Sequence, residues 1–163
     1  MKFDTLVEQT LLNEKLFRLS GKSNPIISKA ASEFMKNNKK IKSKEEFEEA
    51  ISDQKSIDTW NNTLLEGIFK KIPKEDITYV WTNTSIMDWE CKEIDEKSTS
   101  CWAYNNVNIG LKYDADARKH AKKVRGNVTR VEGYKDKIYG EADGDDQNIV
   151  LGDSLLEYLI ENK

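Results

Sequence analysis

The sequence predicts an α+β fold in which a helical N-terminal region is followed by an antiparallel sheet. Apolar residues recur every three to four positions up to Ile72 and every second position after Pro73. Pro73 itself cannot continue a helix, so it marks the change. We therefore expect a helical region over residues 1–72 and an α+β region over residues 75–163, and leave open whether the two form one compact unit. With 37% hydrophobic and 34% charged residues, the chain has the composition of a soluble globular protein.

Four helices are predicted before Pro73, each from an apolar stripe. They cover residues 3–19, 25–35, 44–51 and 56–72, approximately. Asn24-Pro25 supplies an N-cap followed by proline at the first helical position. Ser43 and Glu46 form a capping box at the start of the third helix. Ser20-Gly21 is expected to end the first helix.

A β-hairpin is predicted around the loop Asp95-Glu96-Lys97, because the runs on both sides of it alternate apolar and polar residues. A three-residue loop sets Cys91 opposite Cys101 and Trp89 opposite Ala103. Both apolar sets then share one face of the sheet, as burial requires. We expect the two cysteines to be cross-strand neighbours, reduced in the cell and able to form a disulfide on purification.

The remaining elements are an inserted helix, further strands and a C-terminal helix. The inserted helix is expected from Ala115 to Val124, ended by Gly126. Strands are expected near residues 77–81, 128–134, 137–141 and 148–151. The stretch Ser154-Leu155-Leu156-Glu157 resembles a capping box, so the chain is expected to close on a helix that Asp153 or Ser154 caps.

Charge is distributed unevenly along a chain whose net charge is −3. Residues 112–130 hold seven basic and two acidic residues, whereas residues 141–163 hold seven acidic residues and one lysine. The basic segment is either neutralised by Glu141 to Asp146 or available to an acidic partner. Lysine outnumbers arginine 22 to 4, which argues against sequence-specific nucleic-acid recognition without excluding contact through residues 112–130. The candidate partner-binding residues here are Arg118, Lys119, Lys122 and Lys123.

Ser100-Cys101-Trp102-Ala103-Tyr104 resembles the segment around the nucleophile of papain-like cysteine proteases. That resemblance implies a catalytic Cys101 thiolate with His120, the single histidine, as its base. The sequence lacks the family's preceding Cys-Gly and its glutamine oxyanion donor, and the alternation after Cys101 favours a strand. We therefore favour a core cysteine for Cys101 and a solvated helix face for His120, and keep the cysteine hydrolase as the alternative function.

Asp143, Asp145 and Gln147 have the spacing of the first ligands of a calcium loop. Asn148 stands where such a loop needs glycine and Ser154 where it needs glutamate, so a polar hairpin turn is the preferred interpretation. Two cysteines and one histidine without short ligand spacing do not predict a zinc site. No glycine-rich phosphate loop occurs, and no cofactor is predicted.

The opening residues, Met1 to Glu14, resemble the leader of tailed-phage virion proteins, which often begin Met-Lys-Phe and continue as an amphipathic helix ending in Leu-Asn-Glu. The resemblance implies a phage-encoded virion or host-directed accessory protein, located in the host cytoplasm or the virion. The continuous apolar stripe and the joint Gly21-Lys22-Ser23 leave two alternatives for the first helix. Leu6, Leu12 and Leu16 either dock it on a protein partner or pack it against the predicted helix from Ile57 to Ile72. No secretory signal and no apolar run long enough for a membrane span are found. Because the spacings that would indicate catalysis are absent or broken, the predicted function is non-enzymatic protein interaction.

Overall fold

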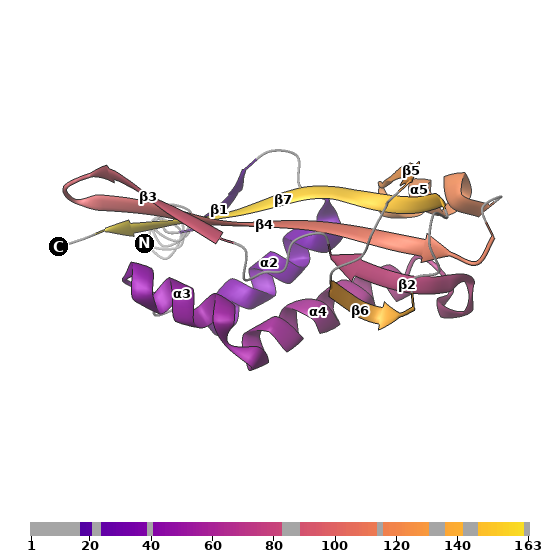
Figure 1. Ribbon diagram of the computed structural model, residues 1–163, viewed down its shortest axis with the longest axis horizontal. Coiled ribbons are helices and arrows are strands. Elements are labelled where there is room, and N and C mark those ends of the chain that lie inside the picture. The colour runs from indigo at the N-terminus through magenta and orange to yellow at the C-terminus, as the bar shows by residue number, and fades with distance from the viewer. Residues whose placement is uncertain are drawn as a thin grey trace, which may run out of the picture.

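The computed structural model describes residues 17–20, 24–38, 41–82, 89–113, 116–130, 136–141 and 147–161. A seven-stranded antiparallel sheet forms one layer, and helices α2, α3 and α4 form a second layer against one face of it (Figure 1). The protein is therefore α+β, as the change of period at Pro73 predicts. No helix in the described ranges is long and apolar enough to cross a membrane.

Two long strands organise the sheet, β4 (Ser98–Leu111) and β7 (Gln147–Glu161). They pair antiparallel from Ser98↔Glu161 to Gly110↔Asn148, with one irregularity between Asn106 and Asn108. The five shorter strands are β1 (Phe17–Ser20), β2 (Ile77–Thr82), β3 (Trp89–Asp95), β5 (Asn127–Arg130) and β6 (Asp136–Gly140). Strands β2 and β3 pair with the edge of β4 that faces away from β7. Strands β1 and β5 pair with the edge of β7 that faces away from β4. Strand β6 extends the sheet beyond β2.

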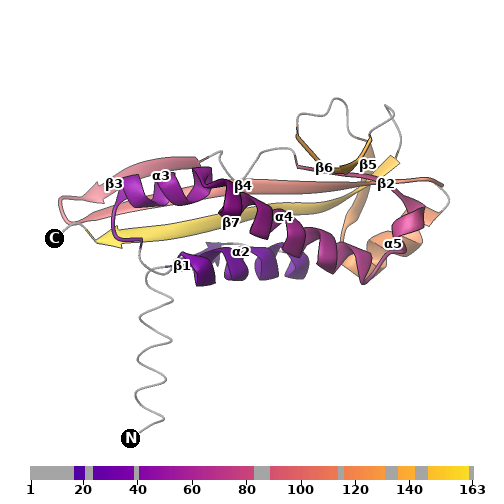
Figure 2. The same cartoon turned by 90° about the horizontal axis from the view of Figure 1, so that it is seen from below.

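The three covering helices are α2 (Pro25–Asn37), α3 (Lys44–Ser52) and α4 (Gln54–Phe69). Their first turns are capped by side chains: Asn24 accepts from Ile26 N, Ser43 from Glu46 N, and Asp53 from Ser56 N. Helices α2 and α4 lie side by side across the sheet (Figure 2). The second, third and fourth predicted helices are thus present, and a 3-10 turn (Lys74–Asp76) follows Pro73.

Among the described residues, a hydrophobic cluster joins the helices to the sheet. Phe34, Trp60 and Ile68 are buried on the helix side, and Val80, Ile109 and Ile149 are buried on the sheet side. The ring of Phe34 meets Trp60 edge to face, with centroids 6.4 Å apart. The helical and sheet regions therefore bury their apolar surface against each other.

The predicted hairpin register is confirmed from Trp89 to Glu93: Cys91 pairs with Cys101 and Trp89 with Ala103. The predicted three-residue loop is wrong, because a register shift after Glu93 sets Asp95 opposite Ser98 and leaves only residues 96–97 between the strands. The two cysteines form a disulfide, with their Cα atoms 4.1 Å apart. Trp89 lies on the helix face, where its ring meets Phe47 of α3 edge to face at 6.2 Å.

The predicted C-terminal helix is wrong, because residues 147–161 form the single strand β7. Leu155, Leu156, Leu159 and Ile160 fit a helical stripe as well as a strand with apolar residues on both faces. In the fold this stretch lies between β4 and β1, so pairing with distant strands overrides the local helical pattern. Only the first part of β7, near residues 148–151, was predicted as a strand.

The end of the predicted first helix is also wrong, since Phe17–Ser20 is strand β1, paired with Leu155 to Tyr158. Residues 3–16 lie outside the described residues. The predicted strand over residues 128–134 corresponds to β5, which ends at Arg130. The predicted strand over residues 137–141 corresponds to β6, which begins and ends one residue earlier. These two strands do not pair with each other, because β5 joins β7 and β6 joins β2.

Candidate functional site

Helix α5 (Ala117–Val124) separates its residues cleanly into a buried and an exposed face. Ala117, His120, Ala121 and Val124 are buried, and they follow the three-to-four spacing of one helix face. The exposed face carries four basic residues, Arg118, Lys119, Lys122 and Lys123, which we call the basic face. These are the four partner-binding candidates that the sequence singled out on this segment.

The C-terminal end of α5 is closed by a residue in the left-handed region, Arg125, with φ of 54°. The N–H of Gly126 donates to the carbonyl of Ala121 at 2.9 Å. Gly126 follows the end of α5 as predicted, but the residue with positive φ is Arg125. A glycine is needed at position 126 because β7 approaches it closely. A Cβ there would lie 2.9 Å from the carbonyl oxygen of Val150 and would collide with Ile149.

Asn24 connects α5 to the helical layer. Its side-chain oxygen caps α2, and its Nδ2 donates to the carbonyls of Val124 at 2.6 Å and Arg125 at 3.3 Å. The residue is only 6% exposed, so these bonds are shielded from water. One side chain therefore satisfies the start of α2 and the end of α5, a hundred residues apart in sequence.

His120 is not on the solvated face that the sequence predicts, since it is only 4% exposed. Its Nε2 lies 3.5 Å from Oδ2 of Asp76, just ahead of β2. Its Nδ1 has no hydrogen-bond partner within the part of the chain that the structure describes. The charge of neighbouring lysines suggested exposure, but position 120 shares the buried face with Ala117, Ala121 and Val124.

The two basic residues at the start of α5 oppose the stability of the helix. Arg118 and Lys119 occupy the first turn, where the helix dipole disfavours positive charge. They also stand four residues before Lys122 and Lys123, a spacing that sets like charges side by side. Among the described residues, no carboxylate forms an ion pair with any of these four side chains.

The surface next to the N-terminal end of α5 adds an aromatic ring. Tyr113 is 55% exposed, and Nζ of Lys112 lies 5.6 Å from the centre of its ring. The carbonyl of Tyr113 accepts the N–H of Asp116, the residue before α5, at 3.2 Å. The exposed basic surface of this end therefore includes Lys112 and a tyrosine.

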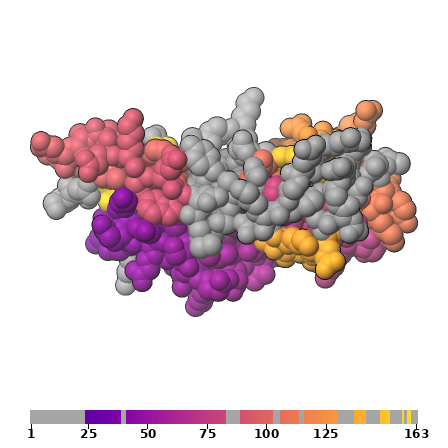
Figure 3. All heavy atoms as spheres, viewed as in Figure 1, coloured from indigo at the N-terminus to yellow at the C-terminus, as the bar shows by residue number. Residues whose placement is uncertain are grey.

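Cys101 and His120, the pair that the papain-like alternative requires, are not brought together. Cys101 lies within β4, fully buried and bonded to Cys91. His120 lies on α5, and the β3–β4 hairpin and α5 occupy opposite ends of the molecule (Figures 1 and 3). Cys101 is not at a helix N-terminus, and its sulfur is held in the disulfide instead of being available as a thiolate.

The other candidates from the sequence fall largely outside the described residues. Leu6, Leu12 and Leu16 do so, as do Asp143 and Asp145 of the calcium-loop pattern. Gln147 is the first residue of β7. Within the described ranges, no group of three or more side chains is placed to hold a metal ion.

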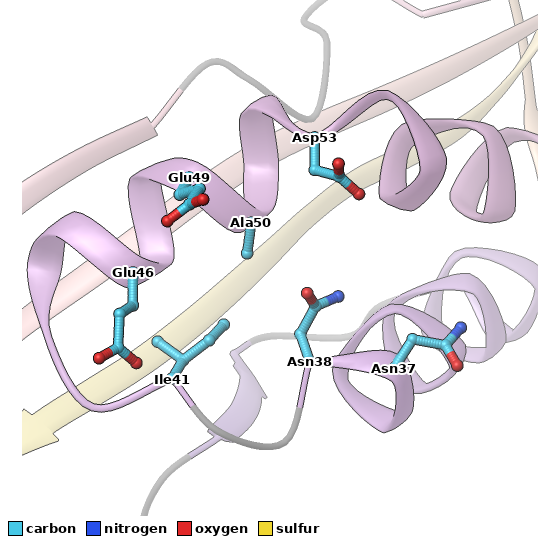
Figure 4. A pocket seen from close by; sticks show the side chains of 7 residues that line it. All are labelled: Asn37, Asn38, Ile41, Glu46, Glu49, Ala50 and Asp53. Carbon is cyan, nitrogen blue, oxygen red and sulfur yellow. The ribbon is translucent and has the colours of Figure 1, made fainter.

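A pocket of about 430 Å³ opens between the end of α2 and helix α3 (Figure 4). Its lining includes three carboxylates, from Glu46, Glu49 and Asp53. Two of them are engaged in helix starts: Glu46 accepts from Lys42 N at 2.9 Å, and Asp53 accepts from Ser56 at 3.0 Å. The sequence pattern does not place the end of α2 beside these carboxylates.

Comparison of the chain with protein-family models, with curated proteins and with solved structures found no match.

Proposed function

We propose that the protein is a non-enzymatic interaction protein that binds an acidic protein surface through the basic face of α5. The observation that supports it is the arrangement of Arg118, Lys119, Lys122 and Lys123. All four are exposed on one side of a helix whose other side is anchored in the core. Arg118 and Lys119 oppose the helix dipole and stand four residues before Lys122 and Lys123, so like charges repel, and the contribution of the basic face is expected outside the fold.

The lysine-rich composition of the basic face suits an acidic protein partner better than a nucleic acid. Three of the four charges of the basic face are lysines, which hold a point charge and do not pair bidentately with bases or phosphates. An acidic protein surface needs charge complementarity without that geometry. Tyr113, beside the basic face, is a residue type enriched where proteins meet.

The test measures binding of the protein to poly-L-glutamate at low salt. Replacing Arg118, Lys119, Lys122 and Lys123 together by glutamine should raise the Kd about tenfold or more, because four exposed ion pairs are lost. The control replaces four exposed lysines of the helical layer, Lys29, Lys36, Lys55 and Lys71, by glutamine. It makes the same change in net charge at a distant surface, and we expect it to leave the Kd near that of the unmodified protein.

Equal loss of binding in both variants would show that net charge alone acts and would contradict the proposal. Absence of binding by the unmodified protein would do the same.

A parallel measurement uses double-stranded DNA. Tighter binding to DNA than to polyglutamate at the same salt concentration, abolished by the α5 variant, would point to nucleic acid and overturn the protein partner.

We further propose that residues 1–16 supply a second docking surface through Leu6, Leu12 and Leu16, and that the protein acts as a phage accessory or virion protein in the host cytoplasm or the virion. The support is the amphipathic pattern and the resemblance of the first fourteen residues to phage leaders. Because Phe17–Ser20 is part of the sheet, the informative deletion removes residues 2–16 and spares β1.

In a phage-infected culture, we expect the full chain to copurify with a virion component that the deletion variant fails to retain. The melting temperature of the deletion variant should stay within a few degrees. A melting temperature lowered by many degrees would instead show that the segment belongs to the core.

A further inference from the structure

The disulfide joins two strands that differ in position within the sheet. Strand β3 pairs with β4 alone among the described strands, so it lies at an edge. Strand β4 runs between β3 and β7, and Cys101 stands opposite Tyr158 in the register with β7. Cys101 is fully buried, whereas Cys91 is only partly buried. The two sulfur atoms are therefore unequal in access.

This inequality decides which sulfur an incoming thiolate can reach, because exchange requires direct contact with the sulfur that is attacked. Cys91 lies on the edge strand and is only partly buried, so its sulfur is accessible. Cys101 lies on a strand flanked by β3 and β7 and is fully buried, so its sulfur is shielded. Access therefore favours attack on Cys91.

We propose that Cys91 is a thiol-exchange site, at which a small thiol of the glutathione class attaches reversibly as a mixed disulfide. In the first step the thiolate forms a bond to Sγ of Cys91, the Cys91–Cys101 bond breaks, and its electron pair leaves on Cys101, which takes a proton from water. In the second step another thiolate attacks the sulfur of the attached group. This releases the Cys91 thiolate and the oxidised small thiol, so that two thiols are oxidised for each disulfide reduced.

The surroundings allow the exchange without loss of the fold. The backbone pairing of β3 with β4 runs from Trp89 to Asp95 and so extends beyond the disulfide in both directions. The ring of Trp89, two residues from Cys91, is held by Phe47 and by Nζ of Lys44 at 5.8 Å from its centre. The hairpin thus keeps Cys101 next to Cys91, so in the mixed disulfide the Cys101 thiolate can attack Sγ of Cys91, re-form the disulfide and release the small thiol as its thiolate.

The sequence provides a direct test. The folded protein is treated with substoichiometric glutathione, quenched with N-ethylmaleimide in denaturant and digested with trypsin. Cleavage after Lys74, Lys92, Lys97 and Lys112 places Cys91 in the peptide 75–92 and Cys101 in the peptide 98–112. We expect the glutathionyl group on peptide 75–92 and the maleimide on peptide 98–112. The control repeats the reaction in denaturant, where the two peptides should share the glutathionyl group about equally.

A second measurement uses single variants and glutathione disulfide. Cys91 in the Cys101→Ala variant should form the mixed disulfide at least about tenfold faster than Cys101 in the Cys91→Ala variant, since access limits the rate. Circular dichroism verifies that both variants are folded. If either variant is unfolded, the peptide mapping of the unmodified protein tests the proposal by itself. Glutathionyl groups on peptide 98–112 in the folded protein, equal labelling of both peptides, or no reaction in the folded protein would each overturn the proposal.

Discussion

His120 illustrates how a residue that invites a catalytic interpretation can be explained by packing. Its imidazole is buried beneath α5, close to Asp76, and its Nδ1 is unpartnered within the described residues. A buried polar atom without a partner costs free energy, whereas an apolar side chain of similar volume would not.

We therefore predict that His120→Leu leaves the free energy of unfolding unchanged or raises it, because it removes the unsatisfied nitrogen and keeps the volume. His120→Ala should lower the free energy of unfolding by about 2–4 kcal/mol through the cavity it creates. Urea denaturation of both variants measures this. Equal destabilisation by Leu and Ala would show that the contact with Asp76, and not the volume, is what matters.

Gly110 is required by a close approach across the sheet. Gly110 of β4 stands opposite Tyr79 of β2 on one side and opposite Asn148 of β7 on the other. The hydroxyl of Tyr79 extends across the glycine and donates a hydrogen bond to Oδ1 of Asn148. A Cβ at position 110 would collide with the Tyr79 ring. The glycine thus leaves room for a buried aromatic ring.

Gly110→Ala is predicted to lower the free energy of unfolding by about 1–3 kcal/mol, because the ring must move from its site and loses its hydrogen bond. Thermal denaturation detects the loss. In the double variant Tyr79→Leu, Gly110→Ala, the alanine should cost much less than it does in the unmodified background. Additive losses would contradict the steric explanation.

At the level of elements, Asn24 connects the start of α2 to the end of α5. It caps α2 with its oxygen and holds the last carbonyls of α5 with its nitrogen. We predict that Asn24→Ala lowers the free energy of unfolding by about 2 kcal/mol, since both functions are lost. Asn24→Ser keeps the cap of α2 alone and should lose roughly half as much. Chemical denaturation of the two variants separates the contributions, and equal losses would mean that the cap of α2 contributes nothing.

At the level of the whole molecule, the helices and the sheet depend on a common core. Phe34 and Trp60 from the helices belong to the same cluster as Val80, Ile109 and Ile149 from the sheet. A chain of residues 75–163 would expose that apolar face of the sheet to water.

We therefore predict that the fragment 75–163 does not fold by itself, and that the full chain unfolds in one cooperative transition. Calorimetry of the full chain and circular dichroism of the fragment check this. A fragment that is monomeric and has the ellipticity of a folded sheet would show that the α+β region is an independent domain.

The sequence alone determined the elements whose signals are local: α2 and α3 with their caps, α4, α5, and the β3–β4 hairpin with its register from Trp89 to Glu93. In each case, residues close in the chain satisfy one another, by capping or through a short loop that defines the pairing.

Only the tertiary structure decided the state of residues 17–20 and 153–161, the burial of His120 and the link from Asn24 to α5. Leu155, Leu156, Leu159 and Ile160 fit a helix in isolation, and they form a strand because β4 and β1 pair with both edges of β7. Such pairing depends on partners some fifty to a hundred and forty residues away, and its free energy exceeds the weak local preference of a leucine-rich segment for helix.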